Sequence, residues 1–439
     1  METFSFEKYH DTLKNILSIT RGGIVMESRG QLIESKGPQA SIGEICKIHC
    51  SSDKTVLAEV VGFRENRILL MPLGDLGGIS PGVKVSATGS PFDVEVGLNL
   101  IGRIIDGFGN PIDGKGHVEL SEKLSISGEK INPLKRNRIT KPLWTQIRAI
   151  DGVVTIGKGQ RIGIFSGSGV GKSVTLGMIS RNVIADVNVI ALIGERGREV
   201  REFLEKDLGE EGLKRSVVVV VTSDLPPILR IQGAKLAVTI AEYFRNLGRD
   251  VVFLMDSITR IAIAQREVGL SAGEPPTTKG YTPSVFALMP KLLERAGTSE
   301  KGSITGIYTV LVEGDDTNEP VSDIVRSIID GHIVLSRRLA NRGHYPAIDI
   351  LASVSRVQND VVDERHKKIV QKLIELYAVY IEAEDMINIG AYVSGSNPKI
   401  DRAIECIDRI NTFLRQDIEE STSPENALEM LEEAIGGLD

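Results

Sequence analysis

The sequence predicts an α/β protein in which a parallel sheet covered by helices lies between a small β-barrel and a helical domain. Short β-rich runs separated by Gly, Pro, Asn and Asp clusters fill residues 20–90, as in small barrels. Apolar strands alternate with helical stretches over residues 91–358, which is typical of a parallel sheet buried on both faces. Residues 359–439 have a helical period and few strand-like runs, so we expect a helical C-terminal domain there.

The segment before the barrel has a helical pattern of its own. Phe6, Tyr9, Leu13 and Ile16 recur at helical spacing, which predicts a short amphipathic helix over residues 1–19. Its apolar face either packs on the barrel or docks a partner. The barrel strands are expected at 23–26, 45–49, 56–63, 67–71 and 83–87.

The central domain is predicted from its apolar runs, which have the length of strands. Strands are expected at 161–165, 187–193, 216–221, 251–255, 304–311 and 332–335. Between them, 172–183 and 233–247 have the pattern of helices. Strands that are apolar throughout leave no solvated face, so helices must cover both sides of the sheet.

Composition excludes several classes of protein. The 439 residues are 41% hydrophobic and 25% charged, close to a globular average, so disorder or a fibre is not expected. The net charge of -7 argues against DNA or RNA as a partner. No apolar run is long enough for a membrane span, the N-terminus does not read as a secretory signal, and only three cysteines are present, so we expect a cytoplasmic protein.

The strongest chemical signal is the run FSGSGVGKS at 165–173, between an expected strand and an expected helix. Gly167, Gly169 and Gly171 allow the backbone to curl so that its N–H groups face phosphate oxygens. Lys172 would reach the β- and γ-phosphates, and the Ser173 hydroxyl would bind Mg²⁺.

Two further strands of the same sheet are followed by charged residues. Asp256 ends the run VVFLMD, where a second acid can help to hold Mg²⁺. Glu195 and Arg196 follow another strand, and loops at the carboxyl ends of parallel strands converge on one crevice. Glu195 could therefore polarise an attacking water while Arg196 neutralises charge on the γ-phosphate.

A second constellation follows at 344–356. Tyr345 precedes a proline and offers a flat face on which a base can stack, although a buried structural tyrosine fits the sequence equally well. Arg356 could act as an arginine finger in the site of a neighbouring subunit.

Together these segments resemble the rotary-type ATPases related to the catalytic subunit of ATP synthase, and within them most closely the flagellar type III export ATPases. The resemblance covers nearly the whole chain. It rests on GSGVGKS at 167–173, GERGREV at 194–200, TSDLPP at 222–227, FLMDSITRIAIAQRE at 253–267, GEPPTTKGYTPSVFALMPKLLERAG at 273–297, YPAIDILASVSRV at 345–357 and INIGAYVSGS at 387–396. One departure is Ser166, where the family usually has Gly or Ala; another is Gln146, which replaces a common glycine.

The resemblance implies a β-barrel, a RecA-like nucleotide domain and a helical C-terminal domain that assemble as a homo-hexamer with sites between subunits. It implies hydrolysis of ATP with Mg²⁺ that energises protein export. The implied catalytic residues are Lys172, Glu195, Arg196 and Arg356, and the implied metal ligands are Ser173 and Asp256. The implied ATP-binding residues are Gly167, Ser168, Gly169, Val170, Gly171, Lys172, Ser173, Val174 and Tyr345.

The resemblance also implies partners: stator and central-stalk proteins, the export gate at the membrane, and exported substrates with their chaperones. Within the family, the ATPase of a virulence-type secretion system and the catalytic subunit of an ATP synthase are alternatives. Outside the family, two further alternatives are a nucleotide-binding scaffold that does not hydrolyse ATP and an RNA translocase. Glu195 argues against the scaffold, and the acidic balance argues against the translocase.

Overall fold

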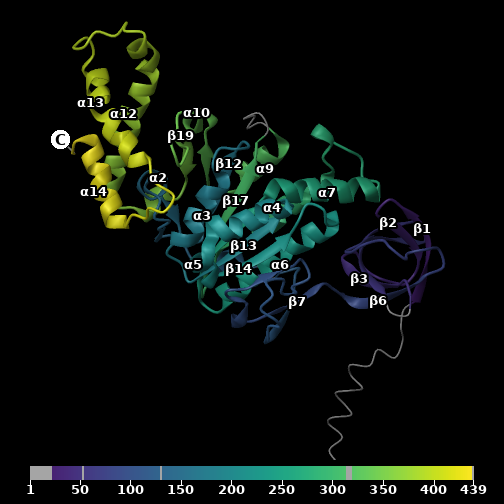
Figure 1. The fold of residues 1–439 in the computed structure, drawn as a ribbon. Coiled ribbons are helices and arrows are strands. Elements are labelled where there is room, and N and C mark those ends of the chain that lie inside the picture. The colour runs from purple at the N-terminus through teal and green to yellow at the C-terminus, as the bar shows by residue number, and fades with distance from the viewer. Residues whose placement is uncertain (1–21, 52–53, 129–130, 313–318, 438–439) are drawn as a thin grey trace, which may run out of the picture. The chain divides into compact units, whose positions relative to one another are not determined.

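The computed structural model describes residues 22–51, 54–128, 131–312 and 319–437 (Figure 1). The chain divides into two compact units. The smaller contains the chain up to Asp93 together with Val268–Glu274, and the larger contains Val94–Glu267 and Pro275–Asp439. The helix expected over residues 1–19 lies outside the described residues.

The smaller unit is a closed six-stranded barrel with the strand order β1-β2-β5-β4-β3-β6. Its strands are β1 (Gly22–Arg29), β2 (Leu32–Lys36), β3 (Glu44–His49), β4 (Thr55–Arg64), β5 (Arg67–Pro72) and β6 (Lys84–Pro91). The sequence predicted the barrel but missed β2. Glu34 and Ser35 of that strand are both buried, and Glu34 is paired with Arg64 and Arg67, so the strand lacks an apolar pattern.

The larger unit is built on a nine-stranded sheet, which confirms the predicted α/β fold. The strand order is β19-β18-β12-β17-β15-β13-β14-β8, and β16 pairs with β17 outside this path. All neighbours along the path are parallel except β18 and β19. The strands are β8 (Ile104–Ile105), β12 (Arg161–Ser166), β13 (Val187–Ile193), β14 (Ser216–Val221), β15 (Asp250–Asp256), β16 (Gly297–Thr298), β17 (Ser303–Leu311), β18 (Gly331–Leu335) and β19 (Ile348–Ser355).

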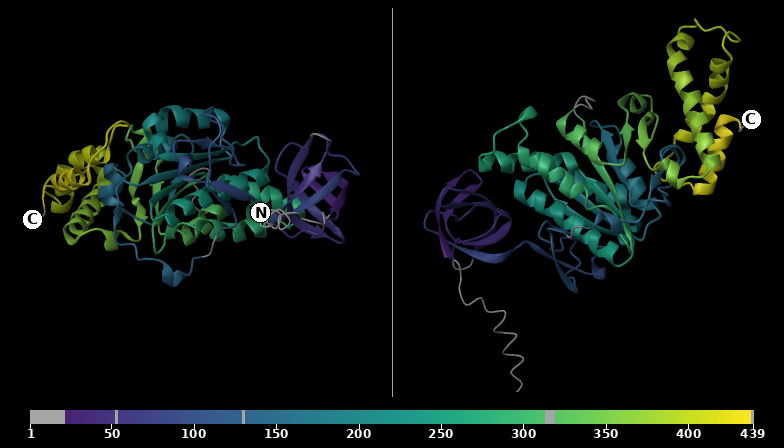
Figure 2. Two further views of the ribbon diagram at one scale, coloured as in Figure 1. Left: turned by 90° about the horizontal axis from the view of Figure 1, so that it is seen from below. Right: turned by 180° about the vertical axis from the view of Figure 1, so that it is seen from behind.

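The central strands are apolar because helices cover both of their faces (Figure 2). Every residue of β13 and β14 is buried, which requires cover on both sides. The helices are α3 (Lys172–Asn182), α4 (Gly197–Glu202), the π-helix η3 (Phe203–Leu208), α5 (Gly209–Lys214), α6 (Pro227–Asn246), α7 (Ile258–Ala272), α8 (Pro283–Leu293), α9 (Pro320–Ile328) and α10 (Arg337–Asn341). Smaller elements are β7 (Asp93–Val96), η1 (Leu98–Leu100), β9 (Glu122–Ser125), η2 (Pro133–Lys135), β10 (Pro142–Leu143), β11 (Ile156–Gly157) and η4 (Thr278–Gly280).

The C-terminal part is helical, as predicted. It consists of α11 (Gln358–Val361), α12 (Glu364–Asn388), α13 (Pro398–Leu414) and α14 (Pro424–Ile435). The helix α2 (Arg148–Val153) packs against α12, α13 and α14, and all six of its residues are buried. One continuous apolar core joins these helices to the sheet, so the C-terminal helices and the sheet support each other.

Candidate active site

The turn between β12 and α3 has the geometry of a phosphate-binding loop. Gly169 and Gly171 have φ of 77° and 90°, which glycine adopts without strain. The helix α3 begins at Lys172 directly after Gly171, so the free N–H groups of its first turn face the loop. Ser166 is the last residue of β12 and is buried, so its departure from the family pattern leaves the glycine turn intact.

Most of the residues predicted to bind ATP line one cavity of about 950 Å³. They are Gly167, Ser168, Gly169, Gly171, Lys172, Ser173 and Val174. Val170 is the exception in this loop, because its side chain is 1% exposed and packs in the core. Only the backbone of Val170 is therefore available to a phosphate.

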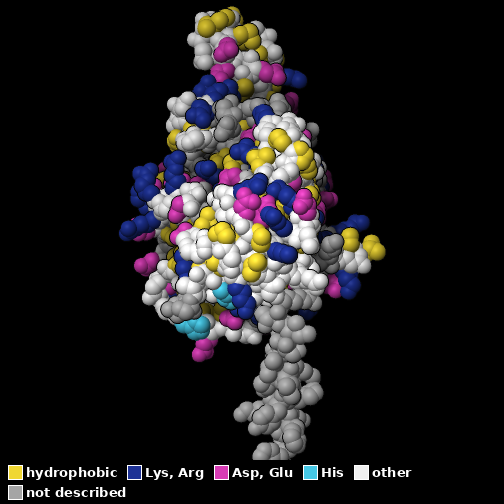
Figure 3. All heavy atoms as spheres, turned by 90° about the vertical axis from the view of Figure 1, so that its right-hand side faces the viewer, with side chains coloured by type: hydrophobic (Ala, Val, Ile, Leu, Met, Phe, Trp, Pro, Cys, Tyr) yellow, Lys and Arg dark blue, Asp and Glu magenta, His cyan; other side chains and the backbone are white. Residues whose placement is uncertain are grey.

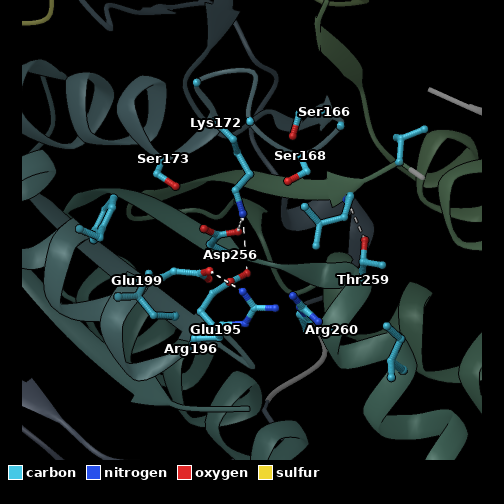
Figure 4. A pocket seen from close by; sticks show the side chains of 18 of the residues that line it. Ser166, Ser168, Lys172, Ser173, Glu195, Arg196, Glu199, Asp256, Thr259 and Arg260 are labelled. Carbon is cyan, nitrogen blue, oxygen red and sulfur yellow. Dashed lines mark hydrogen bonds and ion pairs between the residues drawn. The ribbon is translucent and has the colours of Figure 1, made fainter. Parts of the chain in front are cut away.

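Lys172 sits between two carboxylates that come from neighbouring strands (Figure 4). Its Nζ lies 2.5 Å from Asp256 Oδ1 and 3.7 Å from Glu195 Oε1. Burial lowers the pKa of Lys172, but the two carboxylates outweigh burial and the pKa is raised overall. The ammonium group is therefore charged and placed at the end of the phosphate loop.

Asp256 ends β15 and is positioned by a residue that sequence reasoning missed. Its Oδ1 accepts a hydrogen bond of 2.7 Å from the Thr309 hydroxyl on β17. Thr309 is fully buried in β17, but Ser303 and Thr305 of the same strand are buried and polar as well, so the sequence does not single out Thr309 as the partner of Asp256.

Glu195 follows β13 after Gly194 and is 8% exposed. Burial raises its pKa to about 7; Lys172 lowers it, while the charge of Asp256 and a hydrogen bond to Glu199 raise it further. Glu195 Oε1 accepts no hydrogen bond from the described residues, so this oxygen is available to a ligand. Gly194 has φ of 76°, and a Cβ there would lie 2.8 Å from Cβ of Arg260. Glycine thus allows α7 to approach the turn.

Arg196 differs from Glu195 in its surroundings. Its side chain is 77% exposed and lies 3.4 Å from Glu199 Oε1. Arg260, four residues after Asp256, also lines the cavity. The sequence assigned no role to several other lining residues, namely Glu199, Thr259, Arg266, Glu319 and Arg337. Glu199 lies inside the quoted GERGREV motif, and Thr259 and Arg266 lie inside FLMDSITRIAIAQRE, whereas Glu319 and Arg337 have no local pattern that marks them.

Tyr345 lies beside the phosphate loop but does not line the cavity. A Cβ placed on Gly171 would be 3.6 Å from two carbons of the Tyr345 ring. The side chain is 46% exposed, so the ring has a free face next to the loop. The alternative of a buried structural tyrosine is excluded.

Arg356 is the predicted residue that lies far from the cavity. Ser355 pairs with Gly331 at the start of β18, whereas Ser166 pairs with Leu335 at its end. Four residues of strand separate these pairs by about 13 Å. Arg356 is exposed at the amino edge of the sheet, opposite the phosphate loop.

The residues at the carboxyl edge fit Mg²⁺ bound together with a nucleotide. The Ser173 hydroxyl and the Asp256 carboxylate both line the cavity and offer oxygen ligands. Within the described parts of the chain, three or more His, Cys, Asp or Glu residues never gather as a metal site. Mg²⁺ is commonly held by one or two protein oxygens plus substrate phosphates, and this donor set matches that pattern.

The fold and the loop define a P-loop nucleotide-binding protein. Three family models match the chain: the ATP synthase alpha/beta family nucleotide-binding domain at 146–355, the beta-barrel domain of that family at 25–89, and the T3SS EscN ATPase C-terminal domain at 362–433.

Curated relatives match almost end to end. The flagellum-specific ATP synthase of Bacillus subtilis is 53% identical, covering 98% of this chain and 97% of its own length. The flagellum-specific ATP synthase of Treponema pallidum is 50% identical, covering 96% of this chain and 94% of its own length. The type 3 secretion system ATPase of Xanthomonas euvesicatoria is 48% identical, with 94% and 93% covered.

Solved structures of type III secretion ATPases have the same fold as this chain. The assembled ATPase EscN of the enteropathogenic E. coli type III secretion system matches with a TM-score of 0.90 and 46% identity, covering 94% of this chain and all of that one. EscN in complex with its central stalk EscO matches with a TM-score of 0.88 and 45% identity over the same shares. The chain therefore belongs to the ATP synthase alpha/beta family, in the branch of flagellum-specific ATP synthases and type 3 secretion ATPases, and it is an ATP-hydrolysing enzyme.

Proposed function

We propose that this chain hydrolyses Mg-ATP as a homo-hexameric ring and thereby energises protein export through a flagellar type III apparatus. One observation carries the proposal. Lys172, Glu195 and Asp256 meet at one cavity, while Arg356 lies at the opposite edge of the same sheet. Identical chains placed in a ring can complete each other's sites, because Arg356 of one chain is then free to enter the site of the next.

Nucleotide binding exchanges the partners of Lys172. The γ-phosphate would offer Lys172 Nζ a stronger acceptor than Asp256, which would leave the Asp256 carboxylate able to help hold Mg²⁺. Ser173 and Asp256 would hold Mg²⁺, which neutralises charge on the phosphates when bound. Backbone N–H groups from Gly167 to Ser173 would bind the remaining phosphate oxygens.

Glu195 is suited to orient the attacking water. With its pKa near 7, the carboxyl group is partly ionised at neutral pH and can accept a proton from water. Charge that develops on the γ-phosphate would be stabilised by Arg356 of the neighbouring chain, with Arg196 as a weaker contributor from the solvent side. Tyr345 would stack on the base next to the loop.

The export role rests on the relatives. Those at 53% and 50% identity are named for the flagellum, and the relative named for secretion is at 48%, so the virulence-type alternative is not favoured. The T3SS EscN C-terminal domain match argues against the catalytic subunit of an ATP synthase. EscN has been seen with its stalk EscO, and we propose a stalk protein here, with stator, export gate, substrates and chaperones as further partners.

Location and charge fit this proposal. Among the described helices, none has the length and apolarity that crossing a membrane requires. Figure 3 shows Lys and Arg side chains interleaved with Asp and Glu on one face, rather than a basic surface for nucleic acid. The proposal places the enzyme in the cytoplasm, at the inner face of the export apparatus.

The test is phosphate release from Mg-ATP by the purified chain over a range of protein concentrations, with Glu195→Gln in parallel. Specific activity should rise with concentration and fall about 10²- to 10⁴-fold in the variant, because the general base is lost. ATP binding should persist in the variant. Full turnover by Glu195→Gln would remove Glu195 from the chemistry, and activity that does not depend on concentration would contradict self-assembly.

A further inference from the structure

A short segment between α13 and α14, residues 415–422, lies against α3 and Tyr345; we call it the connector. The backbone N–H of Gln416 donates to the carbonyl oxygen of Tyr345 at 3.0 Å. Two residues later, the carbonyl of Ile418 accepts a hydrogen bond of 2.7 Å from Arg181 Nη2 on α3. The connector thus contacts both the helix that carries the phosphate loop and the residue that faces the loop.

Gln416 fixes the connector through its side chain, which is almost fully buried. Its Oε1 accepts from the backbone N–H of Arg148 at 2.8 Å. Its Nε2 donates to the carbonyl oxygens of Gln146 at 2.8 Å and Glu420 at 2.9 Å. Both donors and the acceptor of the amide are therefore used, and this holds the side chain in one orientation.

Arg148 supports the same segment from beneath. It is 4% exposed, and its Nε donates to the carbonyl oxygen of Phe413 at 2.9 Å at the end of α13. Its guanidinium also binds the carbonyl of Arg415 and the carboxylate of Glu420. A buried cation on the last carbonyls of a helix is a favourable cap, so the start of the connector is rigid.

The connector sets the position of Tyr345. Its ring lies next to Gly171, and its carbonyl accepts a hydrogen bond from the backbone N–H of Gln416, whose side chain is itself held by three hydrogen bonds. A change at Gln416 would therefore move the ring relative to the phosphate loop without touching Lys172, Glu195 or Asp256.

We propose that Gln416 is a positioning residue that holds Tyr345 beside the phosphate loop and so sets the preference of the enzyme for a purine triphosphate. The inference rests on the proposed function, in which Tyr345 stacks on the base. A displaced ring would lose stacking with a purine more than with the smaller pyrimidine, because stacking grows with the overlapping area. Phosphate contacts and the chemical step would remain.

The experiment compares kcat and KM for ATP and UTP in the wild-type chain and in Gln416→Met, which fills the same space without the amide. KM for ATP should rise about threefold to tenfold while kcat stays within about twofold, because ground-state binding alone is weakened. KM for UTP should change little, so the preference for ATP over UTP falls. Tyr345→Ala should lose the same preference.

Thr422→Val is the matched control. Thr422 Oγ1 accepts a hydrogen bond of 3.3 Å from Arg148 Nη1 in the same junction, and its backbone N–H donates to the carbonyl of Gln146, so it binds neighbours of Gln416 rather than Tyr345. This variant should keep the wild-type preference. If Gln416→Met fails to fold in a thermal unfolding assay, Gln416→Glu replaces it, since it keeps the acceptor and loses both donors.

The outcomes separate the inference from the proposed function. Loss of the ATP preference in Gln416→Met and Tyr345→Ala, but not in Thr422→Val, supports the inference. A wild-type preference in Gln416→Met combined with its loss in Tyr345→Ala overturns it and leaves the base contact in place. A wild-type preference in both variants overturns the inference together with the base contact, while phosphate release still reports on ATPase activity.

Discussion

The two edges of the central sheet differ in what they can do alone. At the carboxyl edge, Asp256 and Glu195 are buried, Lys172 is half-buried and paired with both of them, and all three line one cavity. At the amino edge, Arg356 is exposed, and its backbone N–H donates to the carbonyl of Asp330. In the proposed mechanism, one chain binds the nucleotide, while the arginine proposed to stabilise the transition state lies at the opposite edge of the sheet. Binding would then depend on the single chain and full catalysis on the assembly.

The largest expected effect comes from the amino edge. Arg356→Ala should lower kcat about 10³-fold or more, because an arginine finger is worth that much in phosphoryl transfer. Nucleotide affinity, measured by equilibrium binding, should change little, since the carboxyl edge is intact. Wild-type turnover in this variant would contradict the proposal that the amino edge of one chain contributes to catalysis in the next.

The pH dependence of kcat/KM tests the role of Glu195 at the carboxyl edge. The proposed role of Glu195 requires its ionised form, so kcat/KM should be highest above pH 7 and fall toward tenfold per pH unit as the pH drops below about 7. Glu199 raises that pKa through its hydrogen bond to Glu195, so Glu199→Gln should move the acid limb to lower pH. If the acid side of the pH profile is the same in the wild type and in Glu199→Gln, the titrating group is not Glu195 but another, such as the nucleotide itself.

The effects of replacing Arg196 and Arg356 can be compared directly. Arg196→Ala should lower kcat only about tenfold, because its guanidinium lies largely in solvent, where charge interactions are weak. The measurement is steady-state phosphate release beside Arg356→Ala. A larger loss in Arg196→Ala than in Arg356→Ala would reverse the ranking of the two residues.

The smallest effect is expected away from both edges. Gln146 has φ of 62°, a conformation that costs most residues about 1–2 kcal/mol and glycine much less. Gln146→Gly should raise the free energy of unfolding by up to about 1 kcal/mol, after the entropy of glycine is subtracted. Turnover should stay at the wild-type level. A destabilised variant, detected by denaturant titration, would show that the Gln146 side chain contributes more than its backbone costs.

Local patterns explain what the sequence could predict. The six expected strands of the sheet and the phosphate loop are continuous in sequence, and each carries its own signal. Glu195 and Asp256 were found because parallel strands place their carboxyl ends together. The barrel strand β2 was missed because Glu34 is buried by pairing with two arginines from other strands.

Contacts between distant segments could not be predicted. Gln416 and Arg148 are 268 residues apart, and their hydrogen bond depends on how the C-terminal helices dock. Thr309 supports Asp256 from a neighbouring strand 53 residues away. The position of Arg356 required the antiparallel pairing of β19, which no local pattern distinguishes from a parallel strand.

The most direct test of the division between the two edges mixes two inactive chains. Arg356→Ala keeps the carboxyl edge, and Lys172→Ala keeps the amino edge, so neither should turn over ATP alone. In a random equal mixture, about a quarter of the interfaces in a ring pair an intact cavity with an intact Arg356. The account predicts that phosphate release recovers toward that fraction of the wild-type rate. A mixture no more active than the sum of its two components would contradict the claim that Arg356 completes the site of a neighbouring chain.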